Sequence, residues 1–324
     1  MELGRGEGIR LGLDKIAEAP GPYIVSYGFN LDTLCESIRR IGLINPPLVA
    51  RNQAGTFDVV SGYRRILALR ALGERETCCR DVTTVLISPR ERFLASLYEN
   101  LATRPFNDVE KAIILHKLEG HVGTEKILAS FMPLLSLPSH PSTLKFYLKL
   151  LTLEESIRNA IALQQISIKV AKVLVEMEEG TRQVMFQWIS TLKLNFNQQI
   201  KFTEYVEDIR FRDGLMAPEL FSEKPFLEIL ENQRLNNPQK AKAVLEMLRV
   251  RRFPRLAQAK QAVEDAISTI LMPREASIHY DPFLEDPFYH LEIQFKHGKE
   301  LRDALDKLHP MRELEAIPEL WAGV

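Results

Sequence analysis

The chain has 324 residues, of which 45% are hydrophobic and 26% are charged, and its formal net charge at pH 7 is −1. This length exceeds one ordinary hydrophobic core, and this composition is that of a globular protein, so two or three domains are expected. The near-zero net charge excludes a uniformly basic nucleic-acid-binding protein, and any basic surface must therefore be local.

Cysteine usage and the chain start narrow the class further. Cys35, Cys78 and Cys79 form no CxxC pattern and no cluster with histidine, which argues against a structural zinc site and suits a reducing compartment. The opening residues lack the apolar run of a signal peptide, and no stretch approaches the length of a membrane span. We expect a cytoplasmic protein with no membrane-embedded segment.

The first hundred residues alternate between helix and strand patterns. Residues 1–22, rich in glycine, proline and charge, are expected to be a flexible lead-in with room for one short strand. Residues 31–41 have helical spacing, and strands are predicted at 46–50 and 57–61 and within 77–87. Helices are predicted at 64–72 and from Pro89 onward. Residues 23–105 are therefore predicted to form a small α/β domain.

From residue 106 to 212 the pattern is helical only. Asn107 and Glu110 have the spacing of a capping box at the start of a helix. Helices predicted at 125–131 and 142–151 are joined by a proline-containing turn, which is the outline of a helix-turn-helix. The overall fold class is thus α+β, with an all-helical middle domain.

The last third divides into two predicted parts. Residues 213–272 read as a linker, 213–225, followed by a basic helical segment whose core is 240–260. Residues 273–324 offer two strands and an amphipathic helix at 299–311, too few elements to bury a core alone. We expect this C-terminal module to pair two copies of the chain through Leu301, Leu305 and Leu308. The alternative is that it folds back onto the helices of 226–272.

One short segment, SGYRR (61–65), suggests an anion site. A glycine between a strand and a helix offers backbone N–H groups to a phosphate, and arginines would add charge-assisted hydrogen bonds. Two arginines in the first turn otherwise oppose the helix dipole. The alternative is that Arg64 and Arg65 pair with local carboxylates such as Glu99 or Asp58.

A second segment, YENLATRPFND (98–108), offers oxygen ligands for a metal. Glu99 and Asn100 near a helix end would suit Mg²⁺ held jointly with substrate phosphates. The alternative is a solvated acid followed by an asparagine that caps the helix.

Candidate DNA contacts lie on the second helix of the predicted helix-turn-helix and in the basic segment. They are His140, Ser142, Lys145, Lys149, Arg251 and Arg252. An ordinary helical hairpin and a solvated basic helix face explain the same residues without DNA.

In their order along the chain, these segments resemble the ParB family of partition proteins. SGYRRILALRALG resembles the family's GERR box, and ENLATRPFNDVEKAIIL resembles its ENLQR box and the helix that follows. The stretch to residue 177 resembles its helix-turn-helix domain, and YHLEIQFKHGKELRDALDKL resembles its dimerisation module.

The resemblance implies a set of activities and residue roles. It implies binding of CTP with Mg²⁺, slow CTP hydrolysis, binding of double-stranded DNA, a homodimer and a ParA-type ATPase partner. The triphosphate would be held by the first box, namely Ser61, Gly62, Tyr63, Arg64 and Arg65, and the metal by Glu99 and Asn100.

The chain also departs from the family pattern. Tyr63 stands where the family has a glutamate, Ala102 and Thr103 stand where it has Gln-Arg, and Arg104 comes one place late. The upstream GPYIVSYGFN replaces a segment tied to hydrolysis.

Together these observations predict a ParB-like DNA-binding protein for chromosome or plasmid partition or for nucleoid organisation. It would act at the bacterial nucleoid and carry a CTP–Mg²⁺ pocket. The alternatives are an enzyme on the same fold, such as a nucleotide-dependent kinase or nuclease, a helix-turn-helix transcription regulator, or a helical adaptor.

Overall fold

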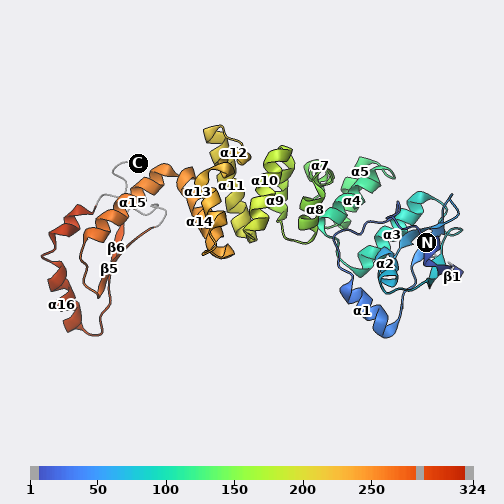
Figure 1. Ribbon diagram of the computed structural model, residues 1–324, viewed down its shortest axis with the longest axis horizontal. Helices are drawn as coiled ribbons and strands as arrows, with labels where there is room; N and C mark the ends of the chain where they lie inside the picture. Colours follow the sequence, from blue (N-terminus) through green and yellow to red (C-terminus); the bar gives the residue numbers. More distant parts are fainter. Residues whose placement is uncertain (1–6, 282–287, 318–324) are drawn as a thin grey trace. The chain divides into compact units, whose positions relative to one another are not determined.

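The structure, a computed structural model, describes residues 7–281 and 288–317. Its internal contacts divide the chain into two compact units, Met1–Ser190 and Thr191–Val324, which are described separately below. Figure 1 shows the elements of each. The mixture of small sheets and many helices confirms the predicted α+β class.

The first unit begins with a four-stranded sheet in the order β1-β4-β2-β3. Its strands are β1 (Glu7–Gly12), β2 (Leu48–Arg51), β3 (Phe57–Ser61) and β4 (Glu76–Asp81). β1 and β4 pair antiparallel, as do β2 and β3, whereas β2 and β4 run parallel. The helices of this part are α1 (Asp32–Ile41), α2 (Tyr63–Ala71) and α3 (Pro89–Thr103). α1 packs against α2, and α3 packs against β3.

Residues 7–16 belong to this sheet rather than to a lead-in. β1 forms its edge, and Leu11, Leu13 and Ile16 are buried in the core. An edge strand can carry exposed charged side chains such as Arg10, because only one of its faces needs to pack. The short strand for which this segment had room is therefore present, and it contributes to the core, whereas the expected flexible lead-in is wrong for these residues.

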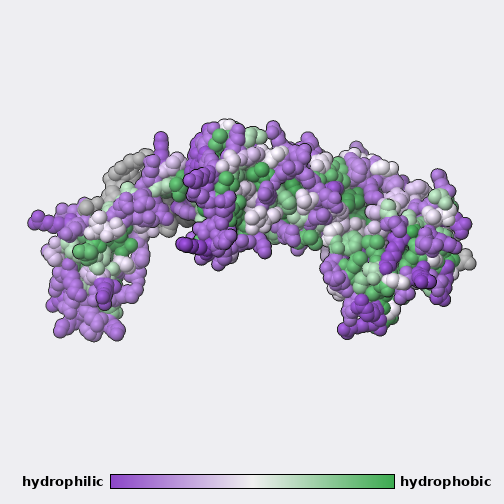
Figure 2. Space-filling model, viewed as in Figure 1, coloured by the Kyte–Doolittle hydropathy of each residue, from purple (hydrophilic) through white to green (hydrophobic). Residues whose placement is uncertain are grey.

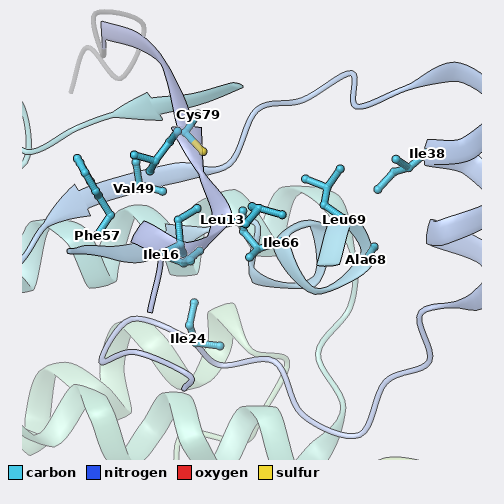
Figure 3. Packing of buried hydrophobic residues seen from close by; sticks show 12 residues of the cluster. Leu13, Ile16, Ile24, Ile38, Val49, Phe57, Ile66, Ala68, Leu69 and Cys79 are labelled. Atoms are coloured by element: carbon cyan, nitrogen blue, oxygen red, sulfur yellow. The ribbon is translucent and has the colours of Figure 1, made fainter. Parts of the chain in front are cut away.

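The core of this domain gathers alternate residues of the strands and the inner face of α2 (Figure 3). Val49, Ile66 and Cys79 are almost completely buried. Burial raises the pKa of the Cys79 thiol to about 11, and the adjacent Cys78 adds to the effect. At neutral pH the Cys79 thiol is protonated and behaves as a small hydrophobic side chain.

The rest of the first unit is helical, as predicted. Its helices are α4 (Asp108–Glu119), α5 (Thr124–Lys126), the π-helical turn η3 (Ile127–Phe131), α6 (Met132–Leu134), α7 (Pro141–Leu150), α8 (Glu155–Ala162), α9 (Ile168–Glu176) and α10 (Glu179–Thr191). The capping box predicted for α4 is present: the Asn107 side chain accepts from the Glu110 N–H, and the Glu110 side chain accepts from the Asn107 N–H. α4 packs against α7 and α8.

The second unit starts with five helices. They are α11 (Phe196–Asp213), α12 (Ala217–Ser222), α13 (Lys224–Glu231), α14 (Asn237–Arg252) and α15 (Pro254–Thr269). Residues 213–225, expected to be a linker, instead form α12 and the start of α13, and Leu220 and Phe221 are buried. Phe221 stacks on Phe202 of α11 with ring centroids 5.5 Å apart. Each proline of this stretch lies in the first turn of a helix, where a missing N–H breaks no hydrogen bond within the helix.

The second unit ends in a hairpin and a helix. β5 (Ala276–Tyr280) pairs antiparallel with β6 (Tyr289–Ile293), and α16 (Gly298–Leu308) and the short η4 (Arg312–Ala316) follow. Tyr280 and Tyr289 pack against Val263 of α15, and the Tyr280 hydroxyl donates to Glu264 at 3.1 Å. α15 thus covers part of the apolar hairpin face, which was the predicted alternative to pairing between copies.

Part of this module stays exposed, however. Leu291 and Phe295 are each 50% exposed, and Leu305 is 48% exposed. Figure 2 shows hydrophobic surface gathered over the region of α15, β5 and β6, amid a largely hydrophilic surface. The contacts of the hairpin with α15 therefore leave apolar area available for a second contact.

Candidate functional site

A cavity of about 300 Å³ opens in the first unit where β3 ends and α2 begins. Its walls come from the segment before α1, the start of α2 and the last two turns of α3. The lining residues are Ile24, Val25, Ser26, Leu34, Asn45, Ser61, Gly62, Tyr63, Arg64, Arg65, Ser96, Glu99, Asn100, Thr103 and Arg104. The structure thus brings all the predicted nucleotide and metal residues together around one space.

The turn into α2 depends on Gly62. Its φ of 90° and ψ of 22° lie in the left-handed region, which disfavours residues with a Cβ. A Cβ at this position would come within 2.8 Å of Arg65 Nε. No side chain caps α2, so the positive end of its dipole is not neutralised by a capping group.

Arg65 is held by a network at one side of the cavity. Its Nη2 donates to Glu99 Oε1 at 2.8 Å, and its Nη1 donates to the Asn45 carbonyl at 2.8 Å. The Ser61 hydroxyl donates to the other oxygen of Glu99 at 2.5 Å. The carboxylate pairing weighed as an alternative is therefore present between Arg65 and Glu99. Asp58, the other suggested partner, instead accepts from the Asn52 amide.

Arg64 pairs with a different acid, Glu110 of α4. Arg64 Nη2 donates to Glu110 Oε1 at 2.7 Å, and Arg104 donates to both oxygens of the same carboxylate at 2.6 and 2.8 Å. The Glu110 side chain is completely buried. Burial lowers the pKa of Arg64, and the nearby positive charge of Arg104 lowers it further, whereas Glu110 opposes both effects. The Phe29 ring lies against the Arg64 guanidinium, with 4.4 Å between the ring centroid and Arg64 Cζ.

Glu110 and Arg104 were not among the predicted site residues. The capping box explained the presence of Glu110 by one hydrogen bond, from the Asn107 N–H to its side chain. The neighbouring residues gave no indication that the same carboxylate also binds two arginines. One signal was available: the two motifs contain three arginines, Arg64, Arg65 and Arg104, but only two acids, Glu99 and Asp108. The excess arginine indicated a further carboxylate partner outside the motifs.

The two predicted metal ligands line the cavity from the penultimate turn of α3. Asn100 does not cap this helix, because α3 continues to Thr103 and Arg104 is the capping residue. The Asn100 amide donates to the Ser96 carbonyl at 2.8 Å. In the part of the chain that the structure describes, no group of three His, Cys, Asp or Glu side chains could hold a metal ion. One carboxylate and one amide fit Mg²⁺ only where phosphates supply further ligands.

The predicted DNA contacts fall into two separate places. His140 caps α7 by accepting from the Ser142 N–H at 3.3 Å, and Ser142 and Lys145 are exposed. Lys149 contacts both oxygens of Glu176 at 2.7 Å. These four residues lie along α7 of the first unit, from the residue that caps its start to its last turn.

Arg251 and Arg252 lie in the second unit, at the end of α14, and both are paired. Arg251 contacts Glu223 at 2.7 Å and Asp213 at 3.2 Å. Arg252 contacts Asp208 at 2.5 Å and lies over the rings of Tyr205 and Phe253. The sequence showed one acid within the basic stretch and could not show that α11 and the residue between α12 and α13 supply others.

The described helices include none with both the length and the apolar character needed to cross a bilayer. The fold and the cavity instead define a small α/β domain with an arginine-rich pocket, followed by helices. Residues 20–101 match the family model of the ParB N-terminal domain. This segment of the chain is therefore similar to the N-terminal domain of the ParB family.

Curated relatives extend this similarity beyond the matched segment. The chain is 28% identical over 183 residues to a nucleoid occlusion protein of Halalkalibacterium halodurans, a match that covers 55% of this chain and 61% of that protein. It is 28% identical over 215 residues to a probable chromosome-partitioning protein ParB of Campylobacter jejuni, covering 64% and 73%. The chain therefore spans less than two thirds of the nucleoid occlusion protein that it matches.

Two solved structures of Caulobacter crescentus ParB, both C-terminally truncated, were also found. One is complexed with CTP-γ-S, with 17% identity and a TM-score of 0.27 over 55% of this chain and 98% of that one. The other is complexed to the centromeric parS site, with 14% identity and a TM-score of 0.33 over 59% and 96%.

Proposed function

We propose that this chain binds CTP with Mg²⁺ in the cavity between α2 and α3 and double-stranded DNA through α7. It would serve chromosome or plasmid partition or nucleoid organisation in the bacterial cytoplasm, with a ParA-type ATPase as partner. The observation that carries the proposal is the placing of Arg64, Arg65 and Arg104 around the uncapped start of α2, within the segment that matches the ParB N-terminal domain.

The roles of the residues follow from their contacts. Arg64 and Arg65, with the backbone of Ser61, Gly62 and Tyr63, would hold the triphosphate. When Arg65 turns from Glu99 to a phosphate oxygen, the Glu99 carboxylate becomes available to Mg²⁺. Asn100 would add an amide oxygen to the same ion.

The proposed site is built for binding more than for turnover. Glu99 is the only carboxylate among the described residues that line the cavity, and Tyr63 stands where the family pattern has a glutamate. With Glu99 committed to Arg65 or to the metal, no second carboxylate lines the cavity to orient an attacking water. We therefore propose slow hydrolysis of CTP at most.

Calorimetry with CTP, ATP and GTP, each with Mg²⁺, tests the nucleotide proposal. Saturable binding of CTP in preference to the other two is expected. Binding of none of them would overturn the proposal. Preference for ATP with transfer of its phosphate, seen by product analysis, would favour the alternative of an enzyme on this fold.

The proposed DNA surface makes a prediction for two lysines of α7. Replacing Lys145 and Lys149 together by alanine should weaken DNA binding and flatten its dependence on salt. The logarithmic slope should fall by about 0.9 for each phosphate that the variant no longer neutralises. Fluorescence anisotropy with a labelled duplex at several salt concentrations measures both quantities.

The double variant Arg251→Ala/Arg252→Ala is the matched control, because it removes the same charge from the end of α14 instead of from α7. We expect its salt slope to equal that of the wild type. A reduced salt slope in this control would indicate that the DNA contacts lie on α14. If the wild-type protein binds no DNA even at low salt, the proposed DNA binding is wrong.

The exposed apolar residues of the C-terminal module predict a homodimer. A two-fold contact would cover Leu291, Phe295 and Leu305 in both copies at once. Sedimentation should show a dimer for the full chain and a monomer for a chain that ends at Met272. A full chain that is folded and monomeric at micromolar concentration would contradict this prediction.

A further inference from the structure

The buried carboxylate of Glu110 joins several parts of the first unit. It accepts from Arg64 of α2, from Arg104 at the end of α3, and from the backbone N–H groups of Tyr27 and Asn107, each at 3.1 Å. Two of these donors, Arg64 and Arg104, also line the cavity. Glu110 itself does not line it, so it acts on a bound molecule only through the arginines.

The charges in this cluster do not balance. Two guanidinium groups face one carboxylate, in a place where Glu110 is fully buried and the side chains of Arg64 and Arg104 are only 27% and 21% exposed. Arg64 is the less satisfied of the two arginines. Arg104 holds both carboxylate oxygens, whereas Arg64 reaches one, and Arg64 Nε is buried without a hydrogen-bond partner in the described structure.

An anion in the cavity would restore the balance. If Arg64 moves from Glu110 to a phosphate oxygen, Arg104 and Glu110 remain as a neutral two-bonded pair, and Glu110 keeps its two backbone donors. The carboxylate then stays buried with its charge compensated by Arg104. The loss of its contact with Arg64 therefore costs little free energy.

We propose that Glu110 is an internal counter-ion that the phosphates of the bound nucleotide displace from Arg64. This inference rests on the proposed function and assigns to Glu110 a positioning and affinity-setting role. In the free protein Glu110 holds Arg64 in place, and on binding it competes with the phosphates for the same guanidinium. Its charge therefore lowers the affinity of the site while keeping the site assembled.

The exchange Glu110→Gln tests this role, because it removes the charge and keeps the shape. We expect the dissociation constants of CTP–Mg²⁺ and of pyrophosphate–Mg²⁺ to fall at least fivefold. A carboxylate that merely holds the arginines in position would give the opposite sign, namely weaker binding on its removal.

Asp108→Asn is the matched control. It removes the same charge from the same first turn of α4, but Asp108 accepts from the Tyr147 hydroxyl and faces Lys111 rather than the arginines. Its affinity for both ligands should stay within twofold of the wild type. An equal gain in both variants would show a general charge effect and overturn the role of Glu110.

A measurement on the wild type covers the case in which Glu110→Gln does not fold. With the glutamate carboxyl carbons labelled with ¹³C, the Glu110 signal should shift on saturation with pyrophosphate–Mg²⁺, as Arg64 leaves it. An unchanged signal at saturation would overturn the proposal. If the wild type and both variants bind neither ligand, the proposed function itself fails, whereas wild-type binding without a gain in Glu110→Gln removes only this inference.

Discussion

Arg64→Ala and Arg65→Ala are each expected to weaken the binding of CTP–Mg²⁺ at least tenfold. A charge-assisted hydrogen bond contributes about 1.5–3 kcal/mol, and a tenfold change in affinity corresponds to about 1.4 kcal/mol. Neither change should unfold the domain, because Glu110 keeps Arg104, and Glu99 keeps the Ser61 hydroxyl. Calorimetry measures the affinity, and circular dichroism checks the fold.

Arg10→Ala is the control for these two variants. Arg10 lies on the edge strand β1, is 73% exposed and pairs only with Glu76 among the described ion pairs. Its removal takes the same charge from the same domain without touching the cavity, so the affinity should not change. Unchanged affinity in both Arg64→Ala and Arg65→Ala would mean that their ion pairs are structural and that the cavity does not hold a triphosphate.

Phe93→Ala is expected to lower the free energy of unfolding of the first unit by about 3–5 kcal/mol. Phe93 of α3 is completely buried and stacks with His121 at a centroid distance of 5.4 Å. Removing its ring leaves a cavity between α3 and the helices that follow it. Denaturant unfolding followed by circular dichroism gives the change.

Tyr98→Ala provides the comparison on the same helix. Tyr98 is 52% exposed, so its truncation should change the free energy of unfolding by no more than about 0.5 kcal/mol. Similar decreases for Phe93→Ala and Tyr98→Ala would show that the packing of α3 differs from the one described.

Local signals predicted most of the fold. The capping box at Asn107, the strand at 57–61 and the glycine at 62 each depend on near neighbours in sequence, and the structure has all three features. Segment 213–225 was misjudged because its prolines and charges are typical of a linker. Both prolines lie in the first turn of a helix, and the buried face of Leu220 and Phe221 is only one turn long.

The candidate site was predicted less completely, because its ion pairs join distant residues. Arg64 and Glu110 are 46 positions apart, and Arg65 and Glu99 are 34 apart. The basic stretch of α14 shows the same limit: its excess charge is visible in sequence, but the acids that balance Arg251 and Arg252 come from α11 and from the residue between α12 and α13. The sequence of one helix shows how many charged residues lie on its face. It does not show which residues of other helices pair with them.

The position of Glu110 also bears on where the N-terminal domain ends. The family match stops at residue 101, and composition placed the boundary at 105, yet the counter-ion of Arg64 and Arg104 is the third residue of the next helix. A fragment cut at either boundary would retain Arg64 and lack the acid that neutralises it. We therefore expect a fragment that extends through α4 to be more stable than a fragment cut at either boundary.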